Sequence, residues 1–306
     1  MTVQTQGQVL LPKVLTAIVT PFDTNEQLDL VSMSELIRYQ LLNDCGVVLF
    51  GTTGECPTIT NDERCSVYSM VQNVFRSNLD EKFVVGVGGN NTHECCELIE
   101  QAHQYGFKNF MLTTPYYNKP TQLGLEKHFT TIMKKFPEYN FILYNVPGRC
   151  GVNLLPETVK NICNQNPNVN AIKEASGDLN QFILIRKLIP DLKLYCGDDG
   201  LIVPAMSIGA YGIISVISNA YPAFVNNIII ESNYNNYTVA FHQYLKVHDI
   251  IKLLFSETSP SPIKFVLQYI GLISTDTVRL PLVQMQNKES MDKLKMLCDN
   301  HNHNNN

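Results

Sequence analysis

The sequence contains no Cys-x-x-Cys pair, no block of basic residues and no long hydrophobic run. A membrane-spanning helix needs roughly 18 consecutive apolar residues, which this chain lacks, so we expect no membrane segment. The polar stretch Met1 to Gln8 carries neither an apolar core nor arginine, so we expect no signal or transit peptide. A net charge of −5 without a basic patch argues against nucleic acid as a partner.

The cysteines show none of the spacings of a disulfide framework or a zinc site. They stand at positions 45, 56, 65, 95, 96, 150, 163, 196 and 298. Their number is odd and the chain is long, so we expect reduced, mostly packed thiols in a cytoplasmic protein. Because no spaced pair of Cys or His ligands occurs, we expect no metal site.

Runs of apolar, β-branched residues alternate with helical patterns along most of the chain. The 306 residues are 44% hydrophobic and 17% charged, a composition typical of a globular protein with a large core. We predict strands at Val14–Phe22, Val47–Gly51, Phe83–Gly88, Lys108–Pro115, Phe141–Pro147, Val169–Ser176, Lys193–Asp198 and Gly212–Asn219. Helical patterns between them include Ser34–Leu42, Asn61–Ser77, Glu94–Tyr105 and Gln122–Lys135. Eight such units predict an α/β fold of the (β/α)8 TIM-barrel type rather than a doubly wound sheet.

The pattern changes after Asn219, where helices follow one another without strands between them. We predict helices at Tyr221–Tyr234, Tyr237–Phe255, Pro262–Gly271 and Lys288–Cys298. The first completes a catalytic barrel that we place at residues 1–234. The others form a C-terminal helical domain at residues 235–298, and the asparagine- and histidine-rich end, residues 299–306, is expected to be disordered.

Unusual polar residues lie at the carboxyl ends of five predicted strands. These segments are Gly51-Thr-Thr-Gly-Glu55, Thr114-Pro-Tyr-Tyr-Asn118, Tyr144-Asn-Val-Pro-Gly-Arg149, Lys173 and Gly197-Asp-Asp-Gly200. In a (β/α)8 barrel the carboxyl ends of all strands meet on one face, where the active sites of this fold lie. We therefore expect the five segments to converge on one site.

Lys173 is the most unusual of these residues because it lies within an apolar strand. Lysine is depleted in strands and is seldom buried without a partner. Burial disfavours the ammonium form of a lysine and leaves a neutral amine, which attacks carbonyl carbons and forms a Schiff base. Taken by itself, the segment also fits a lysine on an edge strand that points into solvent.

The other segments each have a structural and a chemical interpretation. Gly51-Thr-Thr-Gly54 is a tight turn whose hydroxyl and N–H groups suit a carboxylate or phosphate, or it is a turn and nothing more. Arg149 suits two-pronged binding of a carboxylate, or it is an ordinary surface residue. The adjacent acids Asp198 and Asp199 are a weak indication of a metal site. Gly86-Val-Gly-Gly89 lacks the spacing of a dinucleotide-binding loop.

Taken together and in this order, the motifs resemble those of the dihydrodipicolinate synthase family of pyruvate-dependent class I aldolases and lyases. The resemblance runs from about Leu11 to Asn219 and includes Ile172-Lys-Glu-Ala-Ser-Gly-Asp178 and Gly212-Ile-Ile-Ser215. It implies a TIM barrel with a C-terminal helical appendage. It also implies a covalent imine between pyruvate and Lys173, with no cofactor and no metal.

The resemblance assigns catalytic roles to four residues by their motif positions. Lys173 would form the Schiff base. Tyr144, Thr52 and Tyr117 would form a proton relay around it. A hydrogen-bonded relay suits tyrosine, whose ordinary pKa of about 10 makes it a poor base when it acts alone.

Four further positions are implied to bind the substrates. Thr53 would hold the pyruvate carboxylate, while Gly197 and Ile214 would line the pocket with backbone atoms. Arg149 is typical of the synthases of the family, because the sugar-acid aldolases and N-acetylneuraminate lyases lack an arginine in this loop. It would hold the carboxylate of L-aspartate 4-semialdehyde. The product would be 4-hydroxy-tetrahydrodipicolinate, in the first committed step of diaminopimelate and lysine biosynthesis.

Two other functions remain open at this point. The chain could be another pyruvate-dependent class I aldolase, of the N-acetylneuraminate lyase or 2-keto-3-deoxy sugar acid aldolase type. It could also be a catalytically silent paralogue that serves as a scaffold. The complete set of Lys173, Tyr144, Thr52, Tyr117 and Arg149 argues against the scaffold.

In the family, the tyrosine at the position of Tyr117 reaches into the site of a neighbouring subunit, which implies a homo-oligomer, usually a dimer of dimers. The lysine-feedback site of regulated members lies at the same interface, and Asn90, Glu94 and Tyr116 match its pattern. Arg64 departs from that pattern, because some regulated members have a histidine there, and its charge would repel a lysine ammonium. The sequence leaves feedback inhibition open.

Overall fold

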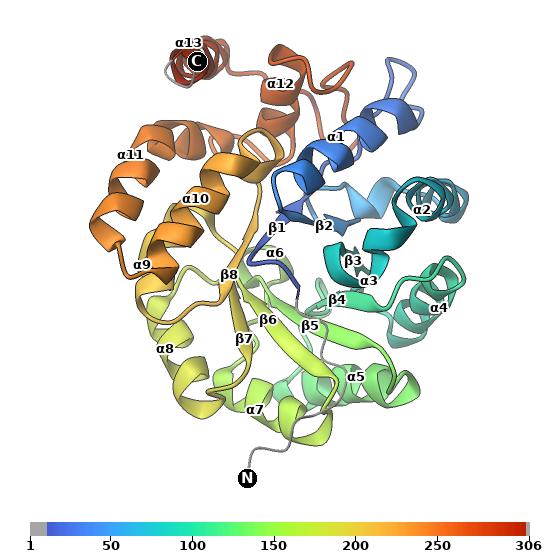
Figure 1. Ribbon diagram of the computed structural model, residues 1–306. Coiled ribbons are helices and arrows are strands. Elements are labelled where there is room, and N and C mark those ends of the chain that lie inside the picture. The colour runs from blue at the N-terminus through green and yellow to red at the C-terminus, as the bar shows by residue number, and fades with distance from the viewer. Residues whose placement is uncertain (1–10, 304–306) are drawn as a thin grey trace.

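The computed structural model describes residues 11–303, and these form a closed barrel of eight parallel strands ringed by helices (Figure 1). The strands are β1 (Val14–Ala17), β2 (Gly46–Leu49), β3 (Phe83–Gly86), β4 (Asn109–Thr113), β5 (Asn140–Asn145), β6 (Val169–Glu174), β7 (Lys193–Cys196) and β8 (Gly212–Ser215). Each strand pairs with the next one along the chain, and β8 closes the barrel against β1. The predicted (β/α)8 TIM barrel is confirmed.

Helices follow the strands, and most of them surround the barrel (Figure 1). They are α1 (Leu30–Leu42), α2 (Asn61–Phe75), α3 (Leu79–Lys82), α4 (Thr92–His103), α5 (Gln122–Lys135), α6 (Pro147–Cys150), α7 (Pro156–Gln165), α8 (Leu179–Leu188), α9 (Ile202–Ser207) and α10 (Pro222–Asn233). A capping box starts α2: the Thr60 hydroxyl accepts from the Glu63 N–H, and the Glu63 carboxylate accepts from the Thr60 N–H. The predicted helix Gln122–Lys135 agrees with α5 at both ends.

The predicted strands are all present, but they extend too far at their carboxyl ends. The first was predicted at Val14–Phe22, whereas β1 ends at Ala17. Ile18, Val19 and Phe22 follow it in the loop and are fully buried. Burial therefore prolongs the apolar run beyond the strand, so the hydrophobic pattern alone does not show where the strand ends.

Two apolar layers stabilise the barrel, one inside the closed sheet and one between the sheet and the helices. The inner layer includes Leu15, Val48, Val84, Met111, Ile142, Ala171, Tyr195 and Ile214. Side chains alternate between the two layers along each strand. On β6, Lys173 stands in register between Tyr144 of β5 and Tyr195 of β7, so all three side chains face the inside of the barrel.

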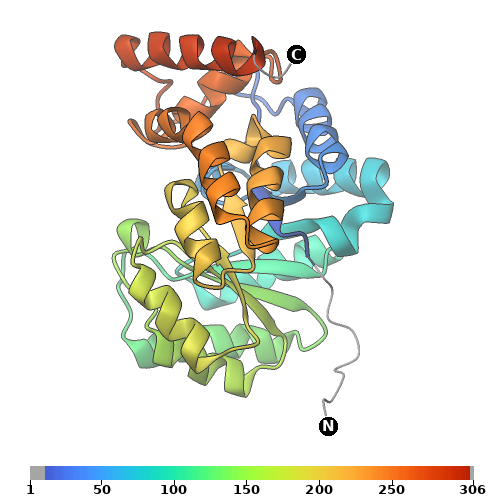
Figure 2. The ribbon, with the colours of Figure 1, turned by 60° about the vertical axis from the view of Figure 1, so that its left-hand side comes forward.

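Three more helices follow the barrel, namely α11 (Tyr237–Leu254), α12 (Ser261–Tyr269) and α13 (Lys288–His303). Figure 2 shows α12 and α13 beyond the rim of the barrel. The predicted C-terminal helices are confirmed, while the domain boundary at residues 234/235 stays a prediction. No helix within residues 11–303 is long and apolar enough to cross a membrane.

The last helix corrects one expectation. Residues 299–303 were predicted to be disordered, but α13 continues through them to His303. Cys298 is fully buried, and the Tyr269 hydroxyl of α12 donates to the Asp299 carboxylate at 2.9 Å. These contacts hold the helix beyond the point where its composition becomes polar. The rest of the expected tail, residues 304–306, lies outside the described residues.

Candidate active site

A cavity of about 520 Å³ opens at the carboxyl ends of the barrel strands. Its walls come from the ends of β2, β5, β6 and β7 and from the C-terminal segment that includes α11. The predicted site residues that line it are Thr52, Thr53, Tyr144, Arg149, Lys173 and Gly197. The structure therefore brings most of the predicted site together around one space.

Lys173 lies in the wall of this cavity and the residue is only 6% exposed. Its Nζ is 4.3 Å from the centre of the Tyr144 ring. Within residues 11–303 it takes part in no ion pair. The alternative of an exposed lysine on an edge strand is wrong, because a closed barrel has no edge strands. An amine without a carboxylate partner, beside a phenol, suits attack on a carbonyl carbon.

The next residue, Glu174, faces away from the cavity and anchors the strand. Its fully buried carboxylate accepts from Asn145 Nδ2 at 3.0 Å, from Gln181 Nε2 at 2.7 Å and from the Ser176 N–H at 2.7 Å. Neutral donors thus satisfy a carboxylate that would be costly to bury alone. The network joins β5, β6 and α8, and it fixes the two strands that carry Tyr144 and Lys173.

Gly197, after β7, provides the room that the Lys173 side chain occupies. A Cβ at this position would lie 3.0 Å from Lys173 Cε and 2.6 Å from the Cβ of Ala175. The second distance is shorter than real side chains show and the first is tight, so a larger residue would require a shift of the strand end and of the lysine. The position was predicted as a backbone contact to substrate, and the structure adds this steric role.

The turn after β2 places Thr52 and Thr53 at the cavity. The Gly54 N–H donates to the Gly51 carbonyl at 3.0 Å, and the Glu55 N–H donates to the Thr52 carbonyl at 3.1 Å. The Thr20 hydroxyl, from the loop after β1, donates to the Gly54 carbonyl at 2.7 Å and so fixes the turn. Hydroxyl groups on such a turn form a binding place for a carboxylate.

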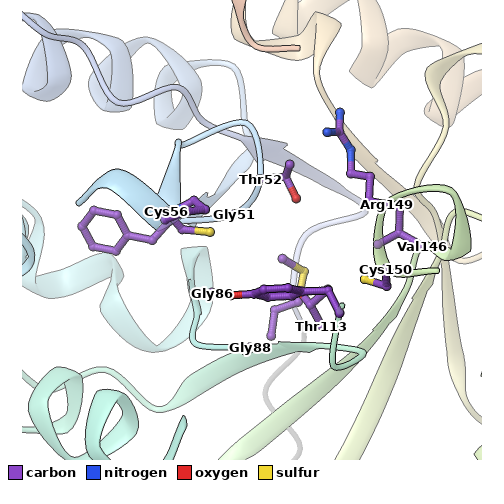
Figure 3. Close-up of a pocket in the computed structure, with 13 residues that line it drawn as sticks. Gly51, Thr52, Cys56, Gly86, Gly88, Thr113, Val146, Arg149 and Cys150 are labelled. Atoms are coloured by element: carbon purple, nitrogen blue, oxygen red, sulfur yellow. The ribbon is translucent and has the colours of Figure 1, made fainter. Parts of the chain in front are cut away.

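Arg149 lies on the short helix α6 after β5, is exposed and lines the edge of the same cavity. It also borders a neighbouring cavity of about 210 Å³, where Figure 3 shows it across from Gly51 and Thr52. Within the described residues its guanidinium forms no ion pair. A cation at the cavity edge without an internal counter-ion is available to bind a carboxylate.

Two predicted residues are not in the large cavity. Ile214 belongs to the inner layer of the barrel and is 1% exposed, while Val216, just after β8, lines the cavity instead. Tyr117 does not line its own chain's cavity, and the residue is 88% exposed. Its φ of +73° is in the left-handed region, which is unfavourable for a bulky residue.

The three residues of the predicted effector site do not share one cavity. Asn90 Nδ2 donates to the Tyr116 carbonyl at 3.2 Å, and Tyr116 lines that cavity. Glu94 stands in the first turn of α4 and borders a separate polar cavity of about 480 Å³. The structure brings Asn90 and Tyr116 into contact and places Glu94 in a neighbouring depression.

The outer wall of the large cavity could not be predicted from the sequence. Tyr244, His248 and Lys252 line it from α11, and Ser259 lines it from the segment before α12. Ser259 is 5% exposed, and its hydroxyl has no hydrogen-bond partner among the described residues. No local motif marks these residues, because they reach the cavity only when the C-terminal helices fold back on the barrel.

The adjacent acids Asp198 and Asp199 have separate structural surroundings. Asp198 lines the large cavity and accepts from the Gly200 N–H at 2.8 Å. Asp199 is buried, and its carboxylate accepts from the Val216 and Ile217 N–H groups. Burial raises the pKa of the Asp199 carboxyl. No cluster of three or more metal-binding side chains occurs within residues 11–303, and all nine cysteines are free thiols.

Comparisons with known proteins agree with this geometry. The dihydrodipicolinate synthetase family model matches residues 10–299. A 4-hydroxy-tetrahydrodipicolinate synthase of Cyanothece sp. is 39% identical over 274 residues, which cover 89% of this chain and 92% of that protein. A crystal structure of dihydrodipicolinate synthase from Thermotoga maritima is 36% identical with a TM-score of 0.90, covering 96% of this chain and 99% of that one.

A third relative is also a solved structure. This dihydrodipicolinate synthase variant, described as monomeric, is 36% identical with a TM-score of 0.89 and covers 94% of this chain and 96% of that one. The match of the family model over nearly the whole chain agrees with the lysine, tyrosine and threonines found around the cavity. The chain belongs to the dihydrodipicolinate synthetase family.

Proposed function

We propose that this protein is a 4-hydroxy-tetrahydrodipicolinate synthase, a lyase that condenses pyruvate with L-aspartate 4-semialdehyde. The observation that carries the proposal is Lys173, a buried lysine beside the Tyr144 ring at the carboxyl ends of the barrel strands. The relatives reported above carry the name of this enzyme. Neither a cofactor nor a metal is needed, because the imine on Lys173 supplies the electron sink.

The first half of the reaction builds the nucleophile. The Lys173 amine attacks the keto carbon of pyruvate, water leaves, and an imine forms. The imine withdraws electrons, so the methyl group loses a proton and becomes the nucleophilic carbon of an enamine. Thr52 and Thr53 hold the pyruvate carboxylate. Tyr144, with Thr52 and the Tyr117 of a neighbouring subunit, relays the protons.

The second half uses Arg149. The guanidinium binds the carboxylate of aspartate semialdehyde, and the enamine carbon attacks the aldehyde carbon. The substrate amine then attacks the imine carbon, which closes the ring and releases Lys173. Aldehydes of neutral sugars lack the carboxylate, so the unpaired Arg149 favours the synthase over the sugar-acid aldolase and N-acetylneuraminate lyase alternatives.

A coupled assay tests the second substrate. The purified protein is given pyruvate with aspartate semialdehyde, and in parallel pyruvate with neutral sugar aldehydes. We expect turnover with aspartate semialdehyde only. In Arg149→Ala we expect its KM to rise by about 100-fold or more, since a charged hydrogen-bonded partner is lost. Turnover of a sugar aldehyde that is unaffected by Arg149→Ala would refute the synthase assignment.

We further propose that the active unit is a homodimer, assembled into a dimer of dimers. The exposed Tyr117 supports this, because a relay residue that lies outside its own cavity has to act in another subunit's site. Asn90, Glu94 and Tyr116 are proposed as an effector site for lysine. Inhibition of turnover by free lysine, abolished in Glu94→Ala, would support that site, and its absence in the parent protein would remove it.

A further inference from the structure

A second buried lysine, Lys264 on α12, forms an ion pair with Glu55. The two side chains are fully buried, and Lys264 Nζ lies 2.5 Å from Glu55 Oε1. Lys264 Nζ also donates to the Thr277 carbonyl at 2.8 Å and lies 4.2 Å from the centre of the Phe22 ring. The other carboxylate oxygen of Glu55 accepts from the Arg279 N–H at 3.0 Å. Both charges are therefore fully partnered.

A pair of this kind is costly to bury. Its desolvation offsets most of the attraction between the charges, and apolar residues of similar size often stabilise a fold equally well. Burial lowers the pKa of the Lys264 ammonium to about 8, although the neighbouring Glu55 carboxylate acts to raise that pKa. A contribution to stability therefore does not explain why the pair is buried at this place in the fold.

Glu55 is the last residue of the turn that carries Thr52 and Thr53. Its backbone is in the left-handed region, with φ of +55°, and its N–H donates to the Thr52 carbonyl. A non-glycine residue holds this conformation only where its surroundings fix it. The buried carboxylate is the anchor, because Lys264 and Arg279 hold it from the C-terminal segment.

Lys264 also belongs to the segment that forms the outer wall of the cavity. Ser259, which lines the cavity, lies five residues before Lys264 in the sequence. Neither Glu55 nor Lys264 lines the cavity. The pair thus connects the threonine turn on one side of the substrate space with the C-terminal wall on the other, without contact with substrate.

We infer that the Glu55–Lys264 pair is a positioning device that holds the Thr52–Thr53 turn in the place where the carboxylate of the keto-acid substrate binds. This inference rests on the proposed function, because it assigns the turn to pyruvate. When the pair is lost, the turn shifts relative to Lys173. Binding of the keto acid weakens, while the chemistry of the lysine itself is left in place.

Two variants separate this role from a structural one. Lys264→Met removes the cation and leaves Glu55 unpaired. The double variant Glu55→Gln/Lys264→Met removes both charges, which relieves the buried unpaired carboxylate. Glu63→Gln is the matched control. It breaks the ion pair between Glu63 and the Arg279 guanidinium, which joins α2 to the same C-terminal segment. The Arg279 group that donates to Glu55 is the backbone N–H, which this variant leaves in place.

The first readout is the pyruvate concentration that gives half-maximal borohydride trapping on Lys173, measured by intact mass. The second readout is the thermal midpoint of each variant. We expect the half-saturating pyruvate concentration to rise by about tenfold in Lys264→Met and in the double variant, since small displacements of binding groups have effects of this size or more. The double variant should regain the thermal midpoint that Lys264→Met loses. Glu63→Gln should lose thermal stability and keep the parent half-saturation.

Each outcome is decisive. If the double variant binds pyruvate like the parent, the pair has only a structural role and the inference is wrong. The same conclusion follows if Lys264→Met lowers the thermal midpoint but leaves the half-saturating pyruvate concentration unchanged. If Lys264→Met does not fold, the double variant decides by itself. Absence of an adduct in the folded parent protein would instead refute the proposed function, which distinguishes the two failures.

Discussion

At the scale of single residues, the site depends on what surrounds Lys173. A glycine gives its side chain room, a tyrosine ring lies beside its amine, and the neighbouring Glu174 is satisfied by neutral donors. Among the described residues, the amine takes part in no ion pair. These features together favour covalent attack on a carbonyl over a structural role for the lysine.

Tyr144→Phe separates the ring from its hydroxyl. The phenylalanine keeps the packing against Lys173 but loses the proton donor, so we expect kcat to fall by about 100-fold or more. The pyruvate adduct should still form on Lys173, only more slowly. Steady-state kinetics and time-resolved borohydride trapping measure the two effects. An unchanged kcat would show that the hydroxyl takes no part in proton transfer.

Residue motifs predicted much of the inner site and none of its outer wall. Lys173 is unusual within an apolar strand, while Tyr144 and Arg149 gained their roles from motif positions shared with the family that the sequence resembles. Lys264 and Ser259 stand in an ordinary helical pattern. The contact between Glu55 and Lys264 spans 209 positions, and only the folded chain shows it.

At the scale of elements, the strands were predictable because β-branched runs alternate with amphipathic helices. Their carboxyl ends were not, since the loops that follow are as buried as the strands. The helical end of the chain was missed for the opposite reason. Residues 299–303 have the composition of a disordered tail, but burial of Cys298 and the bond from Tyr269 to Asp299 extend α13.

The contact between α2 and the C-terminal segment makes stability depend on pH. Hydrogen bonds from Arg279 hold the pKa of the Glu63 carboxyl at about 2, below its usual 4.5. A carboxyl with a lowered pKa in the folded state contributes stability that is complete above the unfolded value and is lost as pH falls toward the folded one. We therefore expect the free energy of unfolding to decrease between about pH 4.5 and 2 more steeply in the parent than in Glu63→Gln.

Urea unfolding of the two proteins at several pH values across this window measures the difference. Other carboxyl groups contribute equally to both proteins, so only the difference between the curves reports on Glu63. Parallel curves would mean that Arg279 does not stabilise the ionised carboxylate.

At the scale of the whole molecule, the exposed Tyr117 is the basis of our proposal that a second copy completes the site. Its side chain lies outside its own cavity, and its left-handed backbone is unfavourable for a bulky residue. Strained residues of this kind persist where function or an interface requires them. In the proposed dimer, one chain provides the lysine, the threonines and the arginine, and its partner provides the tyrosine at position 117.

Mixing two inactive variants tests this arrangement. Lys173→Ala and Tyr117→Phe are each expected to be nearly inactive, and they are refolded together in equal amounts. If Tyr117 acts across subunits, half of the dimers are mixed and one of their two sites is complete, so about 25% of parental activity returns. Each variant refolded alone is the control. No recovery in a mixture that does form dimers would place Tyr117 in its own chain's site.

The central claim is that Lys173 forms an imine with pyruvate, and one measurement tests it most directly. The folded protein is incubated with pyruvate, reduced with borohydride, and analysed by intact mass and peptide mapping. We predict one reduced pyruvyl group per chain, located on Lys173 and absent from Lys173→Ala. A folded protein that gains no mass, or that gains it on another lysine, would contradict this account.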